Sequence, residues 1–338
     1  MTNANIEYAT LGTSGIEVSK VCLGTWAIGG WMWGGTDEKE SIETIRTVID
    51  RGIRFVDTAP VYGFGRSEEI VGKALKGYIP RDQVVIATKV GLEWSDSGKV
   101  LRNSTRQRLL KEVDDSLRRL QVDYIDLYQV HWPDPLVPFE ETAQVMNELL
   151  EAGKIRAIGV SNYSPEQMDA FRKGAPLHSI QPPYNLFERE IEEDILPYAQ
   201  QHKMAVLAYG SICRGLLSGK ISADRSFDGD DLRQHDPKFQ EPHFSQYLEA
   251  VSRLDALAES RHDRRVLELA VRWVLDQGAI ALWGIRRPDQ IDPLDQVFGW
   301  SLSDQDKQDI DEIINSEIDE PVGPEFMTPP SRKNAKKD

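Results

Sequence analysis

Short apolar runs alternate with longer amphipathic stretches along almost the whole chain, and this alternation limits the possible folds most strongly. We expect strands at 18–24, 53–57, 83–89, 123–131, 155–161, 178–184, 204–210 and 279–284. Helical spacing of apolar residues predicts helices at 39–52, 66–77, 104–121 (N-cap Ser104), 138–153, 164–174 and 189–201. Strands that are each followed by a helix predict an α/β fold, a parallel (β/α)₈ barrel of the TIM type.

The start of the chain refines this expectation. Residues 7–19 hold turn residues between two short segments, and we expect them to form a β-hairpin that plugs the barrel floor. An open doubly wound sheet would need a glycine-rich GxGxxG turn after its first strand. The turn here reads LGTWAIGGWMWGG and lacks that pattern. It is more typical of a flexible, tryptophan-lined rim of a pocket, and a simple surface loop is the alternative.

Length, charge and cysteine usage set further limits. The 338 residues are expected to form one barrel domain, with a flexible tail from about residue 331. Cys22 and Cys213 lack metal-ligand spacing, so we expect neither a disulfide framework nor a metal site. The sequence shows no targeting or membrane-spanning pattern and predicts a cytoplasmic protein. A net charge of −15 disfavours nucleic acid and anionic membranes as partners, and the oligomeric state is left open.

Four polar side chains stand where consecutive predicted strands end. Asp57, Lys89 and His131 each close a strand, and Tyr62 follows Asp57 by five residues. All strands of a parallel barrel open on the same face, so we expect these side chains to converge on one pocket. Each alone has a structural explanation as a turn, rim, core or solvated residue. Four of them at one barrel mouth favour a catalytic site.

The chemistry of these four residues suits proton transfer to an oxygen. A phenol ionises near pH ~10, too high for an efficient donor at neutral pH. We expect the Lys89 ammonium to lower the pKa of Tyr62, and Asp57 to keep that ammonium charged and aimed. His131 would donate a hydrogen bond to substrate or share the proton with Tyr62, depending on pH. Because no side chain supplies hydride, carbonyl reduction by this set implies a nicotinamide cofactor. A Schiff-base aldolase that uses Lys89 is the alternative.

Several motifs resemble those of the aldo-keto reductase superfamily from about residue 8 to 325. They are DTAPVYG, ATK, VHWPD, IRAIGVSN, IQPPYN and YGSICRGLLSGK, in that order. The segments GTWAIGGWMWGGTDE and GPEFM are most similar to the bacterial general-stress and glycerol dehydrogenase branch. The resemblance implies a barrel in which Tyr62 is the acid in reduction and the base in oxidation. It also implies that Asp57 and Lys89 tune Tyr62 and that His131 orients the carbonyl.

The same resemblance implies where a cofactor binds. Ser161, Asn162 and Gln181 would hold the nicotinamide carboxamide, and Tyr209 would stack on the ring, although Ser161 and Asn162 could instead cap the following helix. The expected cofactor site also includes Gly24, Thr25, Trp26, Gly210, Ser211, Cys213, Arg214, Gly215, Leu216, Lys220, Arg225, Gly284, Arg286 and Gln290. Backbone N–H groups and hydroxyls of residues 211–216 would contact the pyrophosphate. The polar insertion 217–243 is expected to be a mobile belt over the cofactor or a disordered surface loop.

The end of the last strand bears on the choice of cofactor. Two arginines in GIRRPDQ (284–290) could cradle a 2′-phosphate, so NADP(H) is favoured over NAD(H), with Arg286 as the principal contact and Gln290 on the adenine side. The chain departs from the family at Gly284 and Leu294, where many members have Lys and Asn. We therefore expect affinity for the adenosine end of the cofactor to be either weaker or differently built.

The substrate pocket is expected to be aromatic. Trp26, Trp33, Trp94 and Trp132 would line it, with the tail around Phe326. The resemblance implies a small carbonyl or alcohol substrate, such as glyceraldehyde, methylglyoxal or, in reverse, glycerol. A redox-sensing regulatory subunit that binds NADP(H) but turns over slowly is the remaining alternative.

Overall fold

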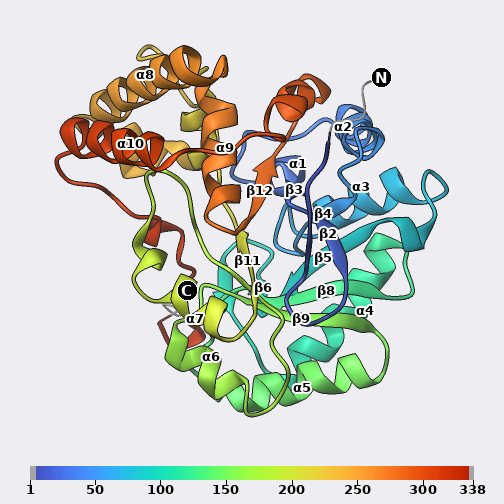
Figure 1. Cartoon of the computed structure of the whole chain (residues 1–338). Helices are drawn as coiled ribbons and strands as arrows, with labels where there is room; N and C mark the ends of the chain where they lie inside the picture. The colour runs from blue at the N-terminus through green and yellow to red at the C-terminus, as the bar shows by residue number, and fades with distance from the viewer. Residues whose placement is uncertain (1–4, 335–338) are drawn as a thin grey trace.

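The computed structural model describes residues 5–334, and its core is a closed barrel of eight parallel strands surrounded by helices (Figure 1). This confirms the predicted fold class. The barrel strands in chain order are β3 (Val21–Gly24), β4 (Phe55–Asp57), β5 (Val85–Val90), β8 (Ile125–Val130), β9 (Ile155–Ser161), β10 (Ser179–Gln181), β11 (Ala205–Ala208) and β12 (Ile280–Gly284). Each pairs with its neighbour in this order, and β12 closes the ring on β3.

Most of the longer α-helices have amphipathic sequences, and their apolar residues join the core cluster around the barrel. They are α1 (Trp26–Gly29), α2 (Glu38–Asp50), α3 (Arg66–Leu75), α4 (Arg106–Leu120), α5 (Phe139–Glu151), α6 (Pro165–Phe171), α7 (Ile195–Gln201), α8 (His243–His262), α9 (Val266–Asp276) and α10 (Asp304–Glu317). Helices α8 and α10 pack side by side at one edge of the molecule (Figure 1). In the described part of the chain, no helix is long and apolar enough to cross a membrane.

The predicted N-terminal hairpin is present. Strands β1 (Tyr8–Thr10) and β2 (Glu17–Ser19) pair in antiparallel fashion. Leu11, Ile16 and Val18 of this hairpin are buried in one cluster with Phe55 and Leu127 from inside the barrel. The hairpin therefore closes the floor of the barrel with apolar side chains.

Side chains along each strand point alternately into and out of the barrel, so the inward-facing residues form layers in its interior. Phe55, Ala87, Leu127 and Ala157 form part of the apolar floor cluster. Two residues further along the same strands stand Asp57, Lys89, Gln129 and Gly159. Because side chains in a strand repeat their direction every second residue, these later positions also face inward, one layer nearer the C-terminal mouth. The intervening residues, such as Val56 and Ile86, belong to the outer core under the helices.

Some local details differ from the sequence-based expectations. The N-cap of α4 is Thr105, because Ser104 is buried and its backbone N–H donates to Asp134. A short antiparallel hairpin, β6 (Leu92–Trp94) and β7 (Val100–Arg102), follows β5 and was not predicted. In the expected tail, Ser331 pairs with Arg102 and the Arg332 guanidinium contacts Asp134 at 2.8 Å. Residues 335–338 of that tail lie outside the described residues.

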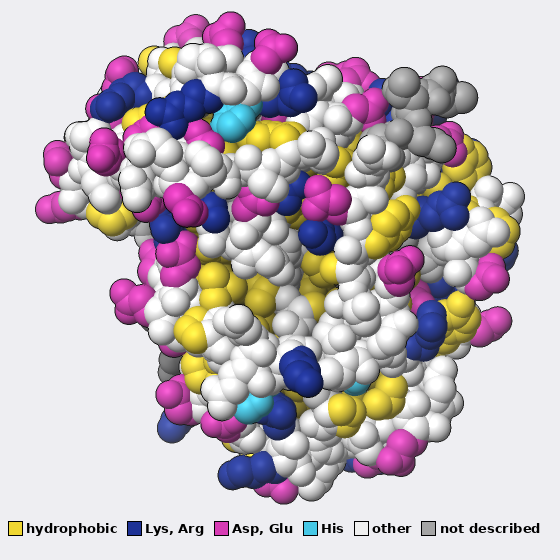
Figure 2. All heavy atoms as spheres, in the orientation of Figure 1, with side chains coloured by type: hydrophobic (Ala, Val, Ile, Leu, Met, Phe, Trp, Pro, Cys, Tyr) yellow, Lys and Arg dark blue, Asp and Glu magenta, His cyan; other side chains and the backbone are white. Residues whose placement is uncertain are grey.

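The surface drawn in Figure 2 mixes both signs of charge. Basic and acidic side chains alternate over the helices at its periphery, while hydrophobic side chains gather in a recess near its centre. The net charge of −15 is therefore not expressed as one acidic field on this face. Local groups rather than the overall charge set the electrostatics of a binding site here.

Candidate active site

A hollow of about 620 Å³ opens where the barrel strands end, and most of the predicted site residues line it. Residues from all parts of the chain contribute to its wall. The predicted residues that do so are Gly24, Thr25, Trp26, Trp33, Asp57, Tyr62, His131, Trp132, Ser161, Asn162, Gln181, Tyr209, Gly210, Arg214, Gly215, Lys220, Arg225, Gly284, Arg286 and Gln290. The barrel mouth thus brings together groups that are more than two hundred residues apart in the sequence.

Asp57, Lys89 and Tyr62 form a continuous hydrogen-bonded relay at the bottom of this hollow. The Lys89 ammonium is fully buried, forms an ion pair with Asp57 Oδ1, and donates to the Tyr62 hydroxyl at 3.1 Å. It also donates to the Thr58 carbonyl at 3.0 Å. These contacts fix the amine directly behind the phenol. Tyr62 lines the hollow, whereas Lys89 does not.

The net pKa of Tyr62 differs in direction from the sequence-based expectation. Burial raises the pKa of the phenol, and this effect outweighs the lowering by the Lys89 ammonium, while Asp57 raises it further. For Lys89 itself, burial would lower the pKa, but the charges of Asp57 and Tyr62 outweigh burial and hold the pKa above its ordinary value. Tyr62 is therefore protonated and Lys89 charged at neutral pH.

His131 completes the group at the wall of the hollow. Its ring meets that of Tyr62 edge-on with centroids 5.8 Å apart. Desolvation by the surrounding protein, together with the Lys89 cation, holds the pKa of His131 well below 6.5. The imidazole is neutral at physiological pH, so proton sharing with Tyr62 is confined to acidic solution.

Comparisons with known proteins agree with this geometry. Residues 20–315 match the model of the Aldo/keto reductase family. The chain belongs to the aldo-keto reductase family. It is 62% identical to Aldo-keto reductase YhdN of Bacillus subtilis over 330 residues, which cover 97% of this chain and 99% of that protein. It is 36% identical to the NADH-specific methylglyoxal reductase of Escherichia coli, over 88% of this chain and 94% of the relative.

Solved structures support the same assignment. A glycerol dehydrogenase from Gluconobacter oxydans superposes with a TM-score of 0.85 at 52% identity, over 97% of this chain and all of the other. An aldo-keto reductase from Bacillus halodurans in its holo form gives a TM-score of 0.74 at 30% identity, over 91% of this chain and 96% of the other. The protein is accordingly an oxidoreductase that acts on carbonyl and CH–OH groups, in a family that uses NAD(P)H.

The residues expected at the nicotinamide are bonded to one another. Ser161 Oγ donates to the Gln181 carbonyl at 2.7 Å, and Tyr209 donates to Asn162 Oδ1 at 3.0 Å. Asn162 Nδ2 in turn donates to the His131 carbonyl at 3.1 Å and has a backbone φ of 61°. These bonds place three polar side chains and one aromatic ring along the wall of the hollow. That set matches the hydrogen-bonding and stacking needs of a nicotinamide carboxamide and ring.

The segment expected to wrap the pyrophosphate is mostly packed inward. The Ser211 hydroxyl donates to the Ala208 carbonyl at 2.8 Å, and Cys213 and Leu216 are fully buried, so these three side chains do not line the hollow. A contribution from their backbone N–H groups stays a prediction. Arg214 lines the hollow, but its guanidinium is committed to Glu188 at 2.5 Å and to Asp236. These buried ion pairs anchor the second half of the insertion 217–243.

Arg286 ties the last strand to the tryptophan loop, residues 25–36. Its guanidinium donates to the carbonyls of Trp33 at 2.7 Å and Gly35 at 2.5 Å. Gln290 Oε1 accepts from the backbone N–H groups of Arg286 and Arg287, at 2.7 Å and 3.0 Å, and so caps the following 3₁₀ helix. Both predicted residues line the hollow, and each also has a structural role that the sequence did not indicate.

The insertion 217–243 is joined to the tryptophan loop by hydrogen bonds. The Asp230 carboxylate accepts from the backbone N–H groups of Met32 at 2.8 Å and Gly34 at 3.0 Å. Beside them, Leu232 N–H donates to the Met32 carbonyl at 3.0 Å. Lys220 and Arg225 of the insertion line the hollow. The two segments together therefore bridge over it, a contact that no sequence motif indicated.

The substrate side of the hollow is aromatic, with one correction. Trp26, Trp33 and Trp132 line it, but Trp94 does not. Trp94 lies in the β6–β7 hairpin and packs against Phe64, with ring centroids 5.7 Å apart, while Leu92 of the same strand faces the hollow. The C-terminal segment 326–330 covers this side with Phe326, Met327, Pro329 and Pro330.

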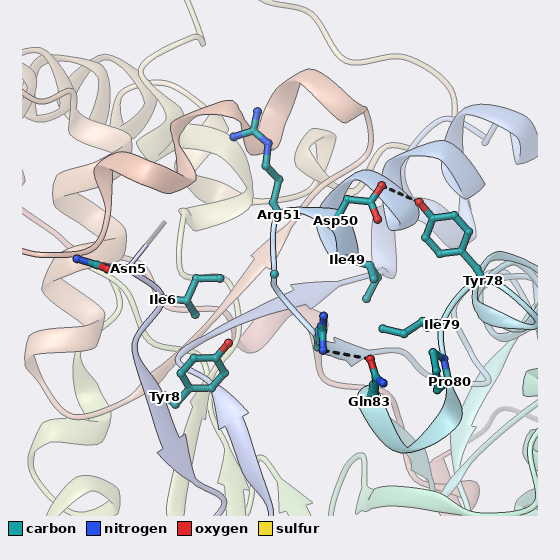
Figure 3. Close-up of a pocket in the computed structure, with 12 residues that line it drawn as sticks. Asn5, Ile6, Tyr8, Ile49, Asp50, Arg51, Tyr78, Ile79, Pro80 and Gln83 are labelled. Carbon is teal, nitrogen blue, oxygen red and sulfur yellow. Dashed lines mark hydrogen bonds between the residues drawn. The ribbon is translucent and has the colours of Figure 1, made fainter. Parts of the chain in front are cut away.

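A second, larger hollow lies near the turns that precede β4 and β5 (Figure 3). Several of its polar side chains are already paired: Tyr78 donates to Asp50 at 2.6 Å, and Arg54 donates to Gln83 at 3.4 Å. Arg51 forms an ion pair with Asp292 at 2.8 Å. This hollow sits at the N-terminal end of the strands, away from the relay, so it carries no part of the reductase site.

Proposed function

We propose that this enzyme is an NADP(H)-dependent reductase that interconverts small aldehydes or ketones and alcohols, with Tyr62 as the general acid and base. The single observation that carries the proposal is the position of Lys89, whose buried ammonium contacts both Asp57 and the Tyr62 hydroxyl. A charged amine behind the phenol stabilises the phenolate that forms when the proton leaves. Tyr62 in turn faces the hollow in which a carbonyl can reach it.

In the proposed mechanism, four side chains have separate roles. A bound nicotinamide supplies or accepts the hydride. In reduction, Tyr62 gives its proton to the carbonyl oxygen as negative charge builds on it, and Lys89 stabilises the resulting phenolate. Asp57 keeps Lys89 charged and oriented. Neutral His131 donates a hydrogen bond that orients the carbonyl, because its depressed pKa leaves one ring N–H and no positive charge at pH 7.

The position of Lys89 disfavours the aldolase alternative. A Schiff-base lysine must lose its proton and reach the substrate. Lys89 is fully buried behind Tyr62, and its pKa lies above the ordinary value because Asp57 and Tyr62 outweigh burial. This amine is therefore neither accessible nor nucleophilic.

The finer assignment of cofactor and substrate rests on local chemistry and on relatives. Arg286 and Arg287 line the hollow and provide the cations that a 2′-phosphate requires. The aromatic wall suits small carbonyls such as glyceraldehyde or methylglyoxal, with glycerol or related polyols in the reverse direction. A methylglyoxal reductase and a glycerol dehydrogenase among the relatives support this class, although the former is NADH-specific by name.

Tyr62→Phe tests the proposal. The variant keeps the ring packing against Trp26 and His131 but has no proton to donate. We expect near-normal NADPH binding and at least a roughly hundredfold lower rate of methylglyoxal reduction. Unchanged turnover would remove Tyr62 from its role. The wild-type rate also separates an enzyme, with typical turnover of about 10 per second, from a redox-sensing subunit that turns over orders of magnitude more slowly.

A further inference from the structure

Gln129 occupies the polar layer of the barrel directly beside the relay. It lies on β8, where the strand register pairs it with Lys89 of β5 on one side and Gly159 of β9 on the other. Its side chain is fully buried. A buried amide must satisfy its hydrogen bonds inside the protein, so its partners reveal what it does.

The partners of Gln129 belong to the relay. Asp57 Oδ1 faces Lys89, and Asp57 Oδ2 accepts from Gln129 Nε2 and Gln181 Nε2, each at 3.0 Å. Gln181 Nε2 also donates to Gln129 Oε1 at 3.1 Å. An ionised carboxylate only accepts hydrogen bonds, so the amide nitrogen of Gln129 must face Asp57. This orientation leaves Gln129 Oε1 as the acceptor for Gln181.

The neighbouring strand is shaped to admit this side chain. A Cβ on Gly159 would lie 2.9 Å from Gln129 Cγ and would also collide with Ser179 Oγ. Gly159 has an ordinary strand conformation, so the missing side chain serves space rather than backbone freedom. The barrel thus leaves room at this level for one long amide.

We propose that Gln129 is a positioning residue of the reductase: its amide holds the Asp57 carboxylate in the orientation from which Asp57 aims Lys89 at Tyr62. The inference rests on the function proposed above for Tyr62. Gln129 does not touch the hollow, so it acts through the two side chains that it contacts, Asp57 and Gln181. Two amide donors on one oxygen also spread the charge of Asp57 and limit how far it cancels the field of Lys89 at the phenol.

The charged and titratable groups around the relay decide the sign of the expected effect. Tyr62 faces Lys89 of β5, Asp57 of β4 and His131 after β8, and Tyr209 after β11 interacts with it as well. Asp57 also faces the Cys22 thiol of β3, which burial keeps neutral. Loss of one donor leaves the charge of Asp57 less balanced, so Tyr62 gives up its proton at a higher pH.

Gln129→Met provides the test, because methionine keeps the length of glutamine and has no N–H donor. The kcat/KM of glycerol oxidation with NADP⁺ is measured from pH 6 to 11, together with NADPH affinity from fluorescence titration. We expect the rise of the profile to move upward by about half to one pH unit and kcat/KM at pH 7 to fall about tenfold. NADPH affinity should change by less than about threefold, because Gln181 keeps its bond to Asp57.

Two further variants separate positioning from packing. In Gln129→Glu the new carboxyl shares a site with Asp57, stays protonated and can donate as the amide did, so this variant should recover most of the activity. Ser179→Ala changes the same layer without touching Asp57, since Ser179 Oγ has no hydrogen-bond partner within residues 5–334. It should keep the wild-type profile.

The outcomes are distinct. A wild-type profile for Gln129→Met, or equal losses in Gln129→Met and Gln129→Glu, overturns the positioning role. If Gln129→Met does not fold, Gln129→Glu alone provides the test. We expect its kcat/KM to be near normal at neutral pH and to fall in alkaline solution, where the second carboxyl ionises. A pH profile parallel to that of wild type contradicts the inference. Tyr62→Phe is measured alongside. Full activity of Tyr62→Phe refutes the proposed function, whereas an inactive Tyr62→Phe with a normal Gln129→Met refutes only this inference.

Discussion

Lys89 donates a 3.1 Å hydrogen bond to the Tyr62 hydroxyl from a position with no solvent exposure. Tyr62 is the member of this pair that lines the hollow, so substrate meets the phenol and not the amine. The ammonium can therefore influence a reaction only through the proton of Tyr62. This relationship explains why Lys89, although it lies near the C-terminal end of a barrel strand, is unsuited to nucleophilic catalysis.

The raised pKa of Tyr62 predicts different pH profiles for the two directions. Burial keeps the phenol protonated through neutral pH, so the acid for reduction is fully present there and is lost only in alkaline solution. Oxidation needs the phenolate. As long as the pH is below the pKa of Tyr62, the phenolate fraction rises about tenfold for each unit by which the pH rises. We expect kcat/KM for methylglyoxal reduction to be flat between pH 6.5 and 8, and kcat/KM for glycerol oxidation to rise steadily over the same interval. A rise of reduction with pH, or a flat oxidation profile, would contradict this reading of Tyr62.

Arg286 is expected to select NADPH over NADH. Removal of its guanidinium in Arg286→Ala costs a charge-assisted contact to the 2′-phosphate, so the Kd for NADPH should rise at least about tenfold. The Kd for NADH should rise less, by about two- to threefold, because that part reflects only the lost bonds to Trp33 and Gly35. Fluorescence titration with both cofactors measures the difference.

Arg287→Ala is compared with Arg286→Ala, because Arg287 is the second cation proposed for the 2′-phosphate. Arg287 is exposed, lies beside Arg286 and pairs with Asp289 at 3.3 Å, so its removal changes the same net charge. We expect a smaller loss of NADPH affinity than for Arg286→Ala. Equal losses of NADPH and NADH affinity in Arg286→Ala would refute the 2′-phosphate contact and leave Arg286 as a support of the tryptophan loop.

The sequence predicted those parts of the site that depend on strand ends. Asp57 and Lys89 meet below the barrel mouth because both lie at the C-terminal ends of neighbouring parallel strands, and parallel strands share a mouth. Their two-residue spacing from Phe55 and Ala87 fixes which face of the strand they occupy. These rules depend only on strand ends and residue spacing. The positions of Asp57 and Lys89 could therefore be predicted from the sequence alone.

The parts that escaped prediction depend on contacts between distant segments. Trp94 does not line the hollow, because β6 pairs with β7, and two strands of only three residues each give no sign of that pairing in the sequence. The net pKa of Tyr62 depends on how deeply the ring is enclosed, which the charges of its neighbours alone do not reveal. Asp230 and Met32 meet across almost two hundred residues through backbone N–H groups, whose placement no side-chain motif encodes.

The contact between Asp230 and the tryptophan loop predicts how cofactor leaves. Its carboxylate bridges the N–H groups of Met32 and Gly34, both of which have positive φ, and so joins the insertion to the loop above the hollow. In Asp230→Ala this bridge is lost, and we expect NADP⁺ to dissociate at least about threefold faster in stopped-flow fluorescence. If opening of the insertion limits turnover, kcat rises while the single-turnover rate of hydride transfer stays the same.

Asp228→Ala controls for the loss of one negative charge from the same segment, because Asp228 is not the acceptor for either N–H group. It should release NADP⁺ at close to the wild-type rate. The Leu232 to Met32 backbone bond persists in both variants, so the insertion remains attached at one point and the chain should stay folded. Equal release rates for wild type and Asp230→Ala would mean that the Leu232 to Met32 bond and the buried ion pairs of Arg214 hold the insertion in place without Asp230.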